Sequence, residues 1–345
     1  MPEMRKSNSQ QSGRRRQFRG NHSIKPIMNQ QEAKKLEITI LTTLKKQLSQ
    51  EETCIVGISG GPDSIFLLHF LKQIPCKTIV AHLNHQLRKE ANDDQAFVEK
   101  ICNNLTVESK KVDIKALSKG KNLEETGRNE RYKFFKQLAK KHKATSILTA
   151  HHANDNLETI ILNFTRGAGL QGLSGMQEIE ELSTNLRLFR PLIDITKKEI
   201  EEYLKLKKIL FRRDKSNKDL IFSRNFIRHK VIPALEKINP NLSKTISKNS
   251  QNLREVQNLI DQKAQNWLQK NRQSLNSKLF LKQPTAVQKA ILLNLHKKII
   301  GDNNNLKSIH LEEVLNLINN NTGNKEKKFG KLTMQLKNNI ITLKK

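Results

Sequence analysis

Residues 53–64 read Thr-Cys-Ile-Val-Gly-Ile-Ser-Gly-Gly-Pro-Asp-Ser, and they decide how this chain begins to fold. The first six form a short apolar run that is typical of a buried strand. An apolar segment with helical spacing, residues 65–71, follows the serine directly. A glycine-rich turn between a strand and a helix offers unpaired backbone N–H groups and the positive end of the helix dipole. The stretch therefore predicts a phosphate-binding turn.

The residues of this turn suit such a site in different ways. Gly60 and Gly61 let the backbone bend tightly and approach a ligand, while the hydroxyls of Ser59 and Ser64 can donate to phosphate oxygens. Asp63 would repel a phosphate unless a cation lay between them, so it is a candidate Mg²⁺ ligand or catalytic residue. The turn lacks the lysine of the Gly-x-x-x-x-Gly-Lys-[Ser/Thr] loop. A simple capping turn would explain one glycine and one serine, but not the whole set in order.

Composition favours a polyanionic partner. The chain has 345 residues, which suggests two domains, and its net charge is +30. Lys and Arg outnumber Asp and Glu by 9 to 2 in residues 1–35 and by 21 to 7 in residues 229–345. An excess of this size attracts phosphate-rich ligands such as nucleic acid. Enrichment in Lys, Asn and Ile from an AT-rich genome is the alternative explanation.

Several classes of protein are disfavoured. Cys54, Cys76 and Cys102 form no Cys-x-x-Cys pair, so neither a zinc ribbon nor a redox motif is supported, and a reducing compartment fits. No apolar stretch approaches the ~18 residues of a spanning helix, so we expect a soluble protein without a membrane partner. Residues 1–32 read as a disordered basic extension. It could bind RNA, serve as a transit peptide, or precede the true start at Met28.

Alternating signals predict an α/β fold with a parallel sheet in residues 33–228. After a helix at 33–48, strands are expected at 53–58, 78–83, 106–112 and 145–150, and helices at 64–73, 90–104, 122–142 and 155–165. Ligands of open parallel sheets bind outside the carboxyl ends of the strands. The polar segments 82–88 and 151–159 follow the second and fourth strands, so we expect both to share one edge with Ser59–Ser64.

Three patterns in this region have more than one interpretation. His151 and Asp155 have a spacing that suits either a metal site or a helix cap. Gly167–Gly172 satisfies Gly-x-Gly-x-x-Gly, but it follows a predicted helix, so a flexible loop is favoured over a dinucleotide site. Arg224 and Arg228 lie four apart and would share a helix face, either gripping phosphates or facing solvent.

The Ser-Gly-Gly-x-Asp-Ser loop resembles that of the ATP pyrophosphatase (PP-loop) family, in which it holds the pyrophosphate of ATP. Three more segments resemble one branch of that family, the tRNA(Ile)-lysidine synthetases. They are His-Leu-Asn-His-Gln-Leu-Arg at 82–88, Asn-Leu-Glu-Glu-Thr-Gly-Arg-Asn-Glu-Arg-Tyr at 122–132, and residues 150–176, beginning Ala-His-His-Ala-Asn-Asp-Asn-Leu-Glu-Thr. The resemblance runs from about Glu51 to Pro233.

This resemblance implies an enzyme that joins lysine to carbon 2 of the wobble cytidine of tRNA(Ile) with the anticodon CAU. It implies ATP and Mg²⁺ as cofactors, an adenylated tRNA intermediate, and release of AMP and pyrophosphate. The implied ATP-binding residues are Ser59, Gly60, Gly61, Pro62, Asp63, Ser64 and His82. The implied catalytic residues are Asp63, His151, Asp155, one of Arg128 and Arg131, and one of Arg224 and Arg228, with Mg²⁺ on Asp63.

Residues 229–345 are expected to form a mainly helical tRNA-binding domain, with helices at 242–271, 284–300 and 308–320 and a hairpin at 328–343. The oligomeric state stays open, with a homodimer as one alternative. The compartment is a bacterial cytoplasm or a plastid stroma. Two other functions stay open: a tRNA-thiolating enzyme of the same family, which would need cysteines near the site, and a non-catalytic RNA-binding protein.

Overall fold

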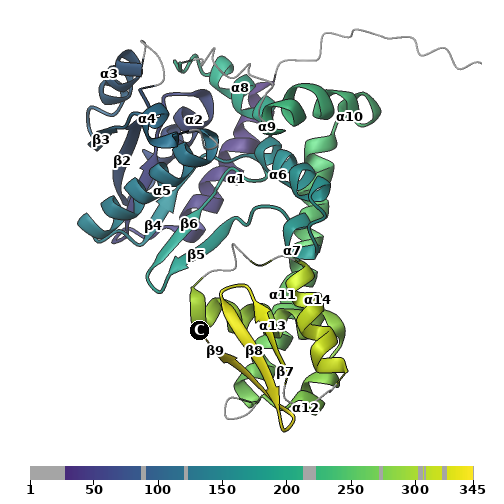
Figure 1. Ribbon diagram of the computed structural model, residues 1–345. Coiled ribbons are helices and arrows are strands. Elements are labelled where there is room, and N and C mark those ends of the chain that lie inside the picture. The colour runs from purple at the N-terminus through teal and green to yellow at the C-terminus, as the bar shows by residue number, and fades with distance from the viewer. Residues whose placement is uncertain are drawn as a thin grey trace, which may run out of the picture.

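The computed structural model describes residues 28–86, 91–119, 123–212, 223–271, 275–301, 306, 308–320 and 325–344. It has a larger α/β lobe and a smaller lobe of helices and strands, and the long helix α11 (Leu242–Lys270) runs between them (Figure 1). The predicted α/β fold with a mainly helical C-terminal part is confirmed.

A six-stranded sheet forms the centre of the larger lobe, in the order β3-β2-β1-β4-β6-β5. Its first four strands are the predicted ones, and β5 pairs antiparallel to β6 while all other neighbours are parallel. The strands are β1 (Thr53–Gly57), β2 (Lys77–Asn84), β3 (Thr106–Lys111), β4 (Ser146–Leu148), β5 (Ile179–Ser183) and β6 (Leu186–Phe189). The strand order reverses at β1 and β4, and a crevice at the carboxyl edge is expected between them.

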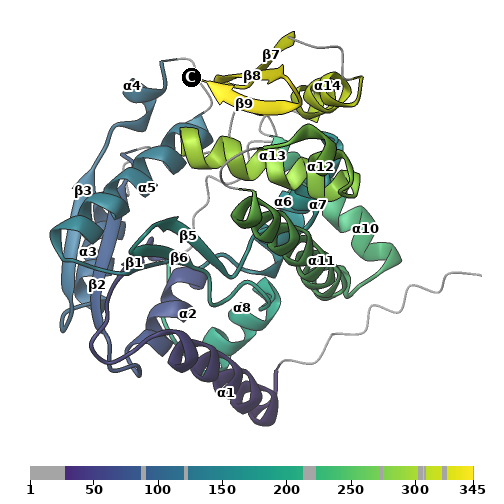
Figure 2. The same ribbon diagram turned by 90° about the horizontal axis from the view of Figure 1, so that it is seen from below.

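Helices cover both faces of this sheet, as Figure 2 shows. On one face, Cys54 and Val56 of β1 pack with apolar side chains of α1, α2, α3 and α8. On the other, Ile55 packs against α5. Because side chains alternate along a strand, the continuous apolar run of β1 can fill both cores. These helices are α1 (Gln30–Gln47), α2 (Pro62–Leu71), α3 (Ala91–Ile101), α5 (Leu123–Lys141) and α8 (Lys197–Leu206).

Helix α1 begins earlier than predicted. Asn29 caps it by accepting a hydrogen bond from the backbone N–H of Glu32, whose carboxylate accepts in return from Asn29 N. Met28 is buried in the core. Residues 28–32 therefore belong to the folded lobe, and not to the disordered extension predicted up to residue 32; residues 1–27 lie outside the described part of the chain.

Helix α11 contributes to both lobes. Its first part packs on α6 (Ala153–Thr165), whereas Ala264 and Trp267 near its end join the core of the smaller lobe. The division predicted after residue 228 assigns all of α11 to the C-terminal domain, whereas its first part packs on α6 of the larger lobe. The smaller lobe also contains α12 (Ser277–Leu281), α13 (Thr285–Ile300), α14 (Ser308–Asn319) and three strands, β7 (Lys325–Phe329), β8 (Leu332–Lys337) and β9 (Ile340–Lys344).

The predicted C-terminal hairpin is a three-stranded antiparallel sheet, β7-β8-β9. The turn between β8 and β9, Asn338-Asn339, was not predicted. Both of its residues have positive φ, 51° and 59°. Two successive left-handed residues are what a tight two-residue hairpin turn requires. The remaining described helices are α4 (Ile114–Ser118), α7 (Leu170–Leu173), α9 (Ser223–Phe226) and α10 (Ile232–Ile238), and a π-helical turn, Ile227–Val231, joins the last two.

Candidate active site

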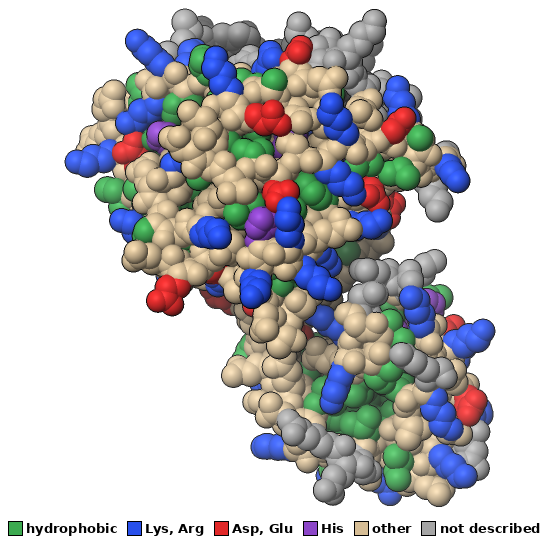
Figure 3. Space-filling model, turned by 90° about the vertical axis from the view of Figure 1, so that its left-hand side faces the viewer, with side chains coloured by type: hydrophobic (Ala, Val, Ile, Leu, Met, Phe, Trp, Pro, Cys, Tyr) green, Lys and Arg blue, Asp and Glu red, His purple; other side chains and the backbone are tan. Residues whose placement is uncertain are grey.

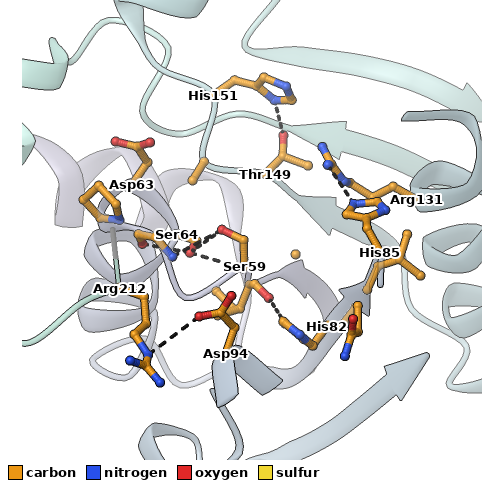
Figure 4. A pocket seen from close by; sticks show the side chains of 18 of the residues that line it. Ser59, Asp63, Ser64, His82, His85, Asp94, Arg131, Thr149, His151 and Arg212 are labelled. Atoms are coloured by element: carbon orange, nitrogen blue, oxygen red, sulfur yellow. Dashed lines mark hydrogen bonds and ion pairs between the residues drawn. The ribbon is translucent and has the colours of Figure 1, made fainter. Parts of the chain in front are cut away.

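A cavity of about 700 Å³ opens at the carboxyl ends of β1, β2 and β4 (Figure 4). It lies where the strand order reverses, as the topology predicts. The turn after β1, the segment after β2 and the segment after β4 all contribute to its wall. Of the predicted site residues, those that line it are Ser59, Gly61, Pro62, Asp63, Ser64, His82, Arg131, His151 and Asp155.

The Ser59–Ser64 turn is held by its own hydroxyls. Ser59 N donates to Ser64 Oγ over 3.2 Å, Ser64 Oγ donates to the Gly61 carbonyl over 3.0 Å, and Gly61 N donates to Ser59 Oγ over 3.3 Å. Gly60 has a φ of 85°, which favours glycine. Gly61 is the N-cap of α2 and offers no side chain to its first turn. The positive end of α2 is thus open to an anion.

Asp63 points toward the cavity from the first turn of α2 (Figure 4). Its Oδ1 is buried, has no hydrogen-bond partner among the described residues, and lies 3.7 Å from Nε2 of His152. Burial raises the pKa of Asp63 above its ordinary value, and the nearby His152 opposes that rise only in part. A carboxylate in this state is stabilised by an added cation.

His151 lies in the segment between β4 and α6, and Asp155 lies in the first turn of α6. Nδ1 of His151 lies 2.8 Å from Oγ1 of Thr149, and burial lowers the pKa of His151 to about 3. At neutral pH the imidazole is therefore uncharged. Burial would raise the pKa of Asp155, but His152, His151 and Arg228 outweigh it and keep that pKa below its ordinary value. Asp155 also accepts from the backbone N–H of His152, in the capping box that starts α6.

Two histidines and an arginine form the wall near β2. Nδ1 of His82 donates to the Ile58 carbonyl over 2.8 Å, and its Nε2 is buried with no hydrogen-bond partner among the described residues. Nη2 of Arg131 lies 3.3 Å from Nε2 of His85. Burial and the adjacent Arg131 lower the pKa of His85 to about 4. This side of the cavity therefore places the uncharged imidazole of His85 beside the fixed cation of Arg131.

Of the four predicted arginines, Arg131 alone lines the cavity. The guanidinium of Arg128 stacks on the ring of Tyr132, 4.9 Å from its centroid. Arg228 binds the buried Glu158 with two hydrogen bonds, of 2.6 and 2.8 Å, and its Nη2 lies 3.5 Å from Asp155. Arg224 donates to Thr159 and lies 3.9 Å from Glu158.

The arginine pair thus meets the acidic face of α6 instead of solvent. Arg228 reaches the cavity through Asp155. Glu158 was not predicted as a site residue, although its place three residues after Asp155, on the same face of a helix, was a usable signal.

Four further charged residues line the cavity without having been predicted: Asp94, Lys197, Glu201 and Arg212. Arg212 lies 3.7 Å from Asp94, and its backbone N–H donates to the Gly60 carbonyl over 2.9 Å. Lys197 opens α8 beside the cap of Thr196. Asp94 lies inside a predicted helix, and the other three lie beyond the last predicted strand of the array, so only the folded chain shows that they reach this edge.

The Gly-x-Gly-x-x-Gly match at Gly167–Gly172 follows helix α6, so the dinucleotide interpretation is excluded. The segment instead turns the chain into α7. Asn156 holds its end, because its Oδ1 accepts from the backbone N–H of Met176 over 2.7 Å and its Nδ2 donates to Ser250 of α11.

The described residues show neither a metal-binding cluster nor a membrane-spanning helix. They contain no group of three or more His, Cys, Asp and Glu side chains arranged to hold a metal ion, so His151 and Asp155 do not form such a cluster in this part of the chain. No helix of the described part has the length and apolar character needed to cross a membrane.

Comparison with known proteins agrees with this geometry. The family model of the PP-loop domain matches residues 31–235, more than half of the chain. The chain belongs to the PP-loop family. The resemblance drawn from the Ser59–Ser64 motif is thereby confirmed.

Curated relatives carry the name tRNA(Ile)-lysidine synthase. The protein from Porphyromonas gingivalis is 40% identical over 59% of this chain and 45% of its own length. The protein from Clostridium perfringens is 34% identical over 78% of this chain and 60% of its own length. The protein from Caldanaerobacter subterraneus is 32% identical over 89% of this chain and 68% of its own length. The chain spans about half the length of the first of these relatives.

Among solved structures, the U34-tRNA thiolase NcsA from Methanococcus maripaludis, with its [4Fe-4S] cluster, is similar to this chain. The TM-score is 0.54 and the identity 18%, over 64% of this chain and 78% of that one. The similarity supports the fold.

Proposed function

We propose that this PP-loop protein joins free L-lysine to carbon 2 of the wobble cytidine of tRNA(Ile) bearing the anticodon CAU, using ATP. The observation that carries the proposal is one cavity that combines the Ser59–Ser64 turn with His151 and Asp155, in a chain 32–40% identical to the named relatives. A volume of about 700 Å³ accommodates a nucleotide.

The reaction explains why such a cavity is needed. The pyrimidine 2-oxygen is a poor leaving group, so it first attacks the α-phosphorus of ATP and expels pyrophosphate. The base is then adenylated, and the amine of lysine attacks carbon 2 while AMP leaves with the oxygen. Charge that develops on the transferring phosphoryl group must be offset by groups fixed in advance.

The described residues can provide those groups. The open N-terminus of α2, with the hydroxyls of Ser59 and Ser64, would hold the pyrophosphate, and Arg131 would face the α-phosphate from the opposite wall. If Thr149 donates to Nδ1 of His151, the uncharged imidazole keeps Nε2–H as a donor toward the phosphate. Asp155, an ionised carboxylate, would bind the lysine amine or orient His151.

The residues also fit Mg²⁺. Magnesium in nucleotide sites is bound by one or two carboxylates together with substrate phosphates, so no large cluster of protein ligands is required. Within the described part of the chain, Oδ1 of Asp63 is buried and has no hydrogen-bond partner, and it lies beside the turn that would hold the phosphates. Bound there with ATP, Mg²⁺ would neutralise phosphate charge.

Thiolation and simple RNA binding are weaker candidates. None of the three cysteines lines the cavity, so a thiolating mechanism would lack its sulfur-handling residues there. A binding protein would not need an unpartnered carboxylate oxygen beside a phosphate turn, since burying one is costly.

The test is incubation of the purified chain with ATP, Mg²⁺, radiolabelled lysine and a tRNA(Ile) transcript carrying CAU. We expect label in the transcript, and none in a transcript carrying another anticodon. Label from ³⁵S-sulfide or cysteine would favour thiolation, and tRNA binding without label from either would favour the binding protein.

A further inference from the structure

Two of the three cysteines, distant in sequence, meet at the end of the sheet away from the cavity. Cys54 is the second residue of β1, and Cys76 directly precedes β2. Their Sγ atoms lie 3.7 Å apart, and Oγ1 of Thr78 lies 3.6 Å from each. Thr78 pairs with Cys54 in the β1–β2 register, which fixes the contact. No function proposed above uses this dithiol.

We propose that Cys54 and Cys76 form a thiol-oxidation site, in which a peroxide converts the two thiols into an intramolecular disulfide between β1 and β2. The two sulfur atoms already lie 3.7 Å apart, so the bond requires the two side chains to move closer together. Cys76 is partly buried and can meet a small oxidant, whereas Cys54 is fully buried.

The chemistry of the pair assigns different roles to the two sulfur atoms. Hydrogen bonds from Cys54 and Thr78 lower the pKa of Cys76 to about 7, despite burial, while contact with Cys76 and burial raise that of Cys54. Cys76 is therefore the thiolate that reacts first. It attacks one oxygen of hydrogen peroxide, giving a sulfenic acid and hydroxide.

The second step closes the bond. The Cys54 sulfur attacks the sulfenic sulfur, its proton leaves with the sulfenic hydroxyl as water, and the disulfide forms. In total the two thiols lose two electrons and two protons, and one peroxide becomes two waters. The resulting ring would enclose the Ser59–Ser64 turn and α2, since both lie between residues 54 and 76.

Cys102 provides a matched control within the same chain. It is buried and free, burial raises its pKa to about 11, and no thiol contact to it is present among the described residues. It should keep its thiol under conditions that oxidise the pair.

The experiment exposes the reduced full chain to hydrogen peroxide, quenches it, and combines thiol counting after denaturation with peptide mass mapping. We expect the thiol count to fall from three to one, a loss of about 2 Da in the monomer, a Cys54–Cys76 cross-linked peptide, and full reversal by a thiol reductant. C102S should behave as the parent does, with one thiol fewer throughout.

Two variants separate the steps. C54S, whose hydroxyl can still donate to the Cys76 sulfur, should leave Cys76 as a sulfenic acid that dimedone traps, and C76S should abolish the reaction with Cys54. Three thiols remaining after treatment, a cross-link through Cys102, or sulfinic acid at Cys76 in place of the bond would overturn the proposal. Because the parent chain is mapped directly, the result does not depend on how the variants fold, or on which substrate the cavity takes.

Discussion

At the scale of single residues, Asp63 is expected to affect the reaction without affecting the affinity for tRNA. Its Oδ1 is buried and its pKa is raised, so a nearby cation would stabilise its ionised form. Most of the lysine and arginine excess that would attract tRNA lies elsewhere, in residues 1–35 and 229–345. Loss of the Asp63 charge should therefore affect the reaction and spare binding.

We expect Asp63→Asn to reduce adenylation of tRNA by about 100-fold or more, the order seen when one prearranged stabilising group is removed. The affinity for tRNA should stay nearly unchanged. Pyrophosphate release and a filter-binding assay measure the two quantities. Asp113→Asn, which alters the exposed cap of α4 and can still cap it, is the control. Equal losses of reaction and binding would contradict the assignment.

His151 should make the folded chain sensitive to acid. Its pKa of about 3 in the folded state lies below the ordinary value near 6.5, so between these values the unfolded chain binds a proton that the folded chain does not. The free energy of unfolding therefore falls as pH decreases from about 6.5 toward 3. One proton contributes at most about 1.4 kcal/mol per pH unit.

We expect His151→Asn to flatten this decline, measured by urea unfolding at several pH values. His85→Asn should act in the same direction, because burial also holds the pKa of His85 low. His229→Asn, at an exposed position, serves for comparison. Parallel curves for the parent and His151→Asn would refute the buried, uncharged imidazole.

At the scale of elements, the junction of α6, α7 and α11 depends on one tight turn. Gly175 has a φ of 70°, and a Cβ there would lie 2.3 Å from Oδ1 of Asn156. That oxygen accepts from the Met176 N–H, and the same amide donates to Ser250. The side chain of Asn156 in α6 thus connects this turn to α11.

Gly175→Ala should lower the free energy of unfolding by about 2 kcal/mol or more, through left-handed strain and overpacking. Gly169→Ala is its matched control, since a Cβ there meets nothing within 4 Å and the φ is −74°. Denaturant unfolding of both variants checks the difference. Equal stability of the two would mean that the turn relaxes freely.

At the scale of the whole molecule, positive charge dominates. Lysine and arginine side chains are spread over both lobes on the face shown in Figure 3, and the chain carries +30 in total. A polyanion that contacts several of these side chains releases its counterions, so its affinity must fall with salt.

We expect the logarithm of the tRNA association constant to fall steeply and linearly with the logarithm of the salt concentration. Removing residues 1–27 should reduce this slope if the basic extension contacts RNA. Fluorescence anisotropy across a salt series measures both chains. An unchanged slope would mean that residues 1–27 make no phosphate contacts with tRNA. A shallow slope in the full chain would contradict the inferred phosphate contacts.

The sequence by itself determined the phosphate turn, the parallel array and the edge at which its polar segments meet. These features are local: an apolar run, two glycines and a helix start fix a turn, and strand direction fixes the edge. Short polar strands such as β5, and the pairing of Arg228 with Glu158, carry no comparable local signal.

Only the tertiary structure decided which arginine faces the cavity, which charged residues join it from α3, α8 and the segment at Arg212, and which cysteines touch. It also decided that α11 belongs to two cores. The physical reason is that these contacts join residues tens of positions apart, and their geometry depends on how whole elements pack. A local stretch of sequence therefore cannot predict these contacts.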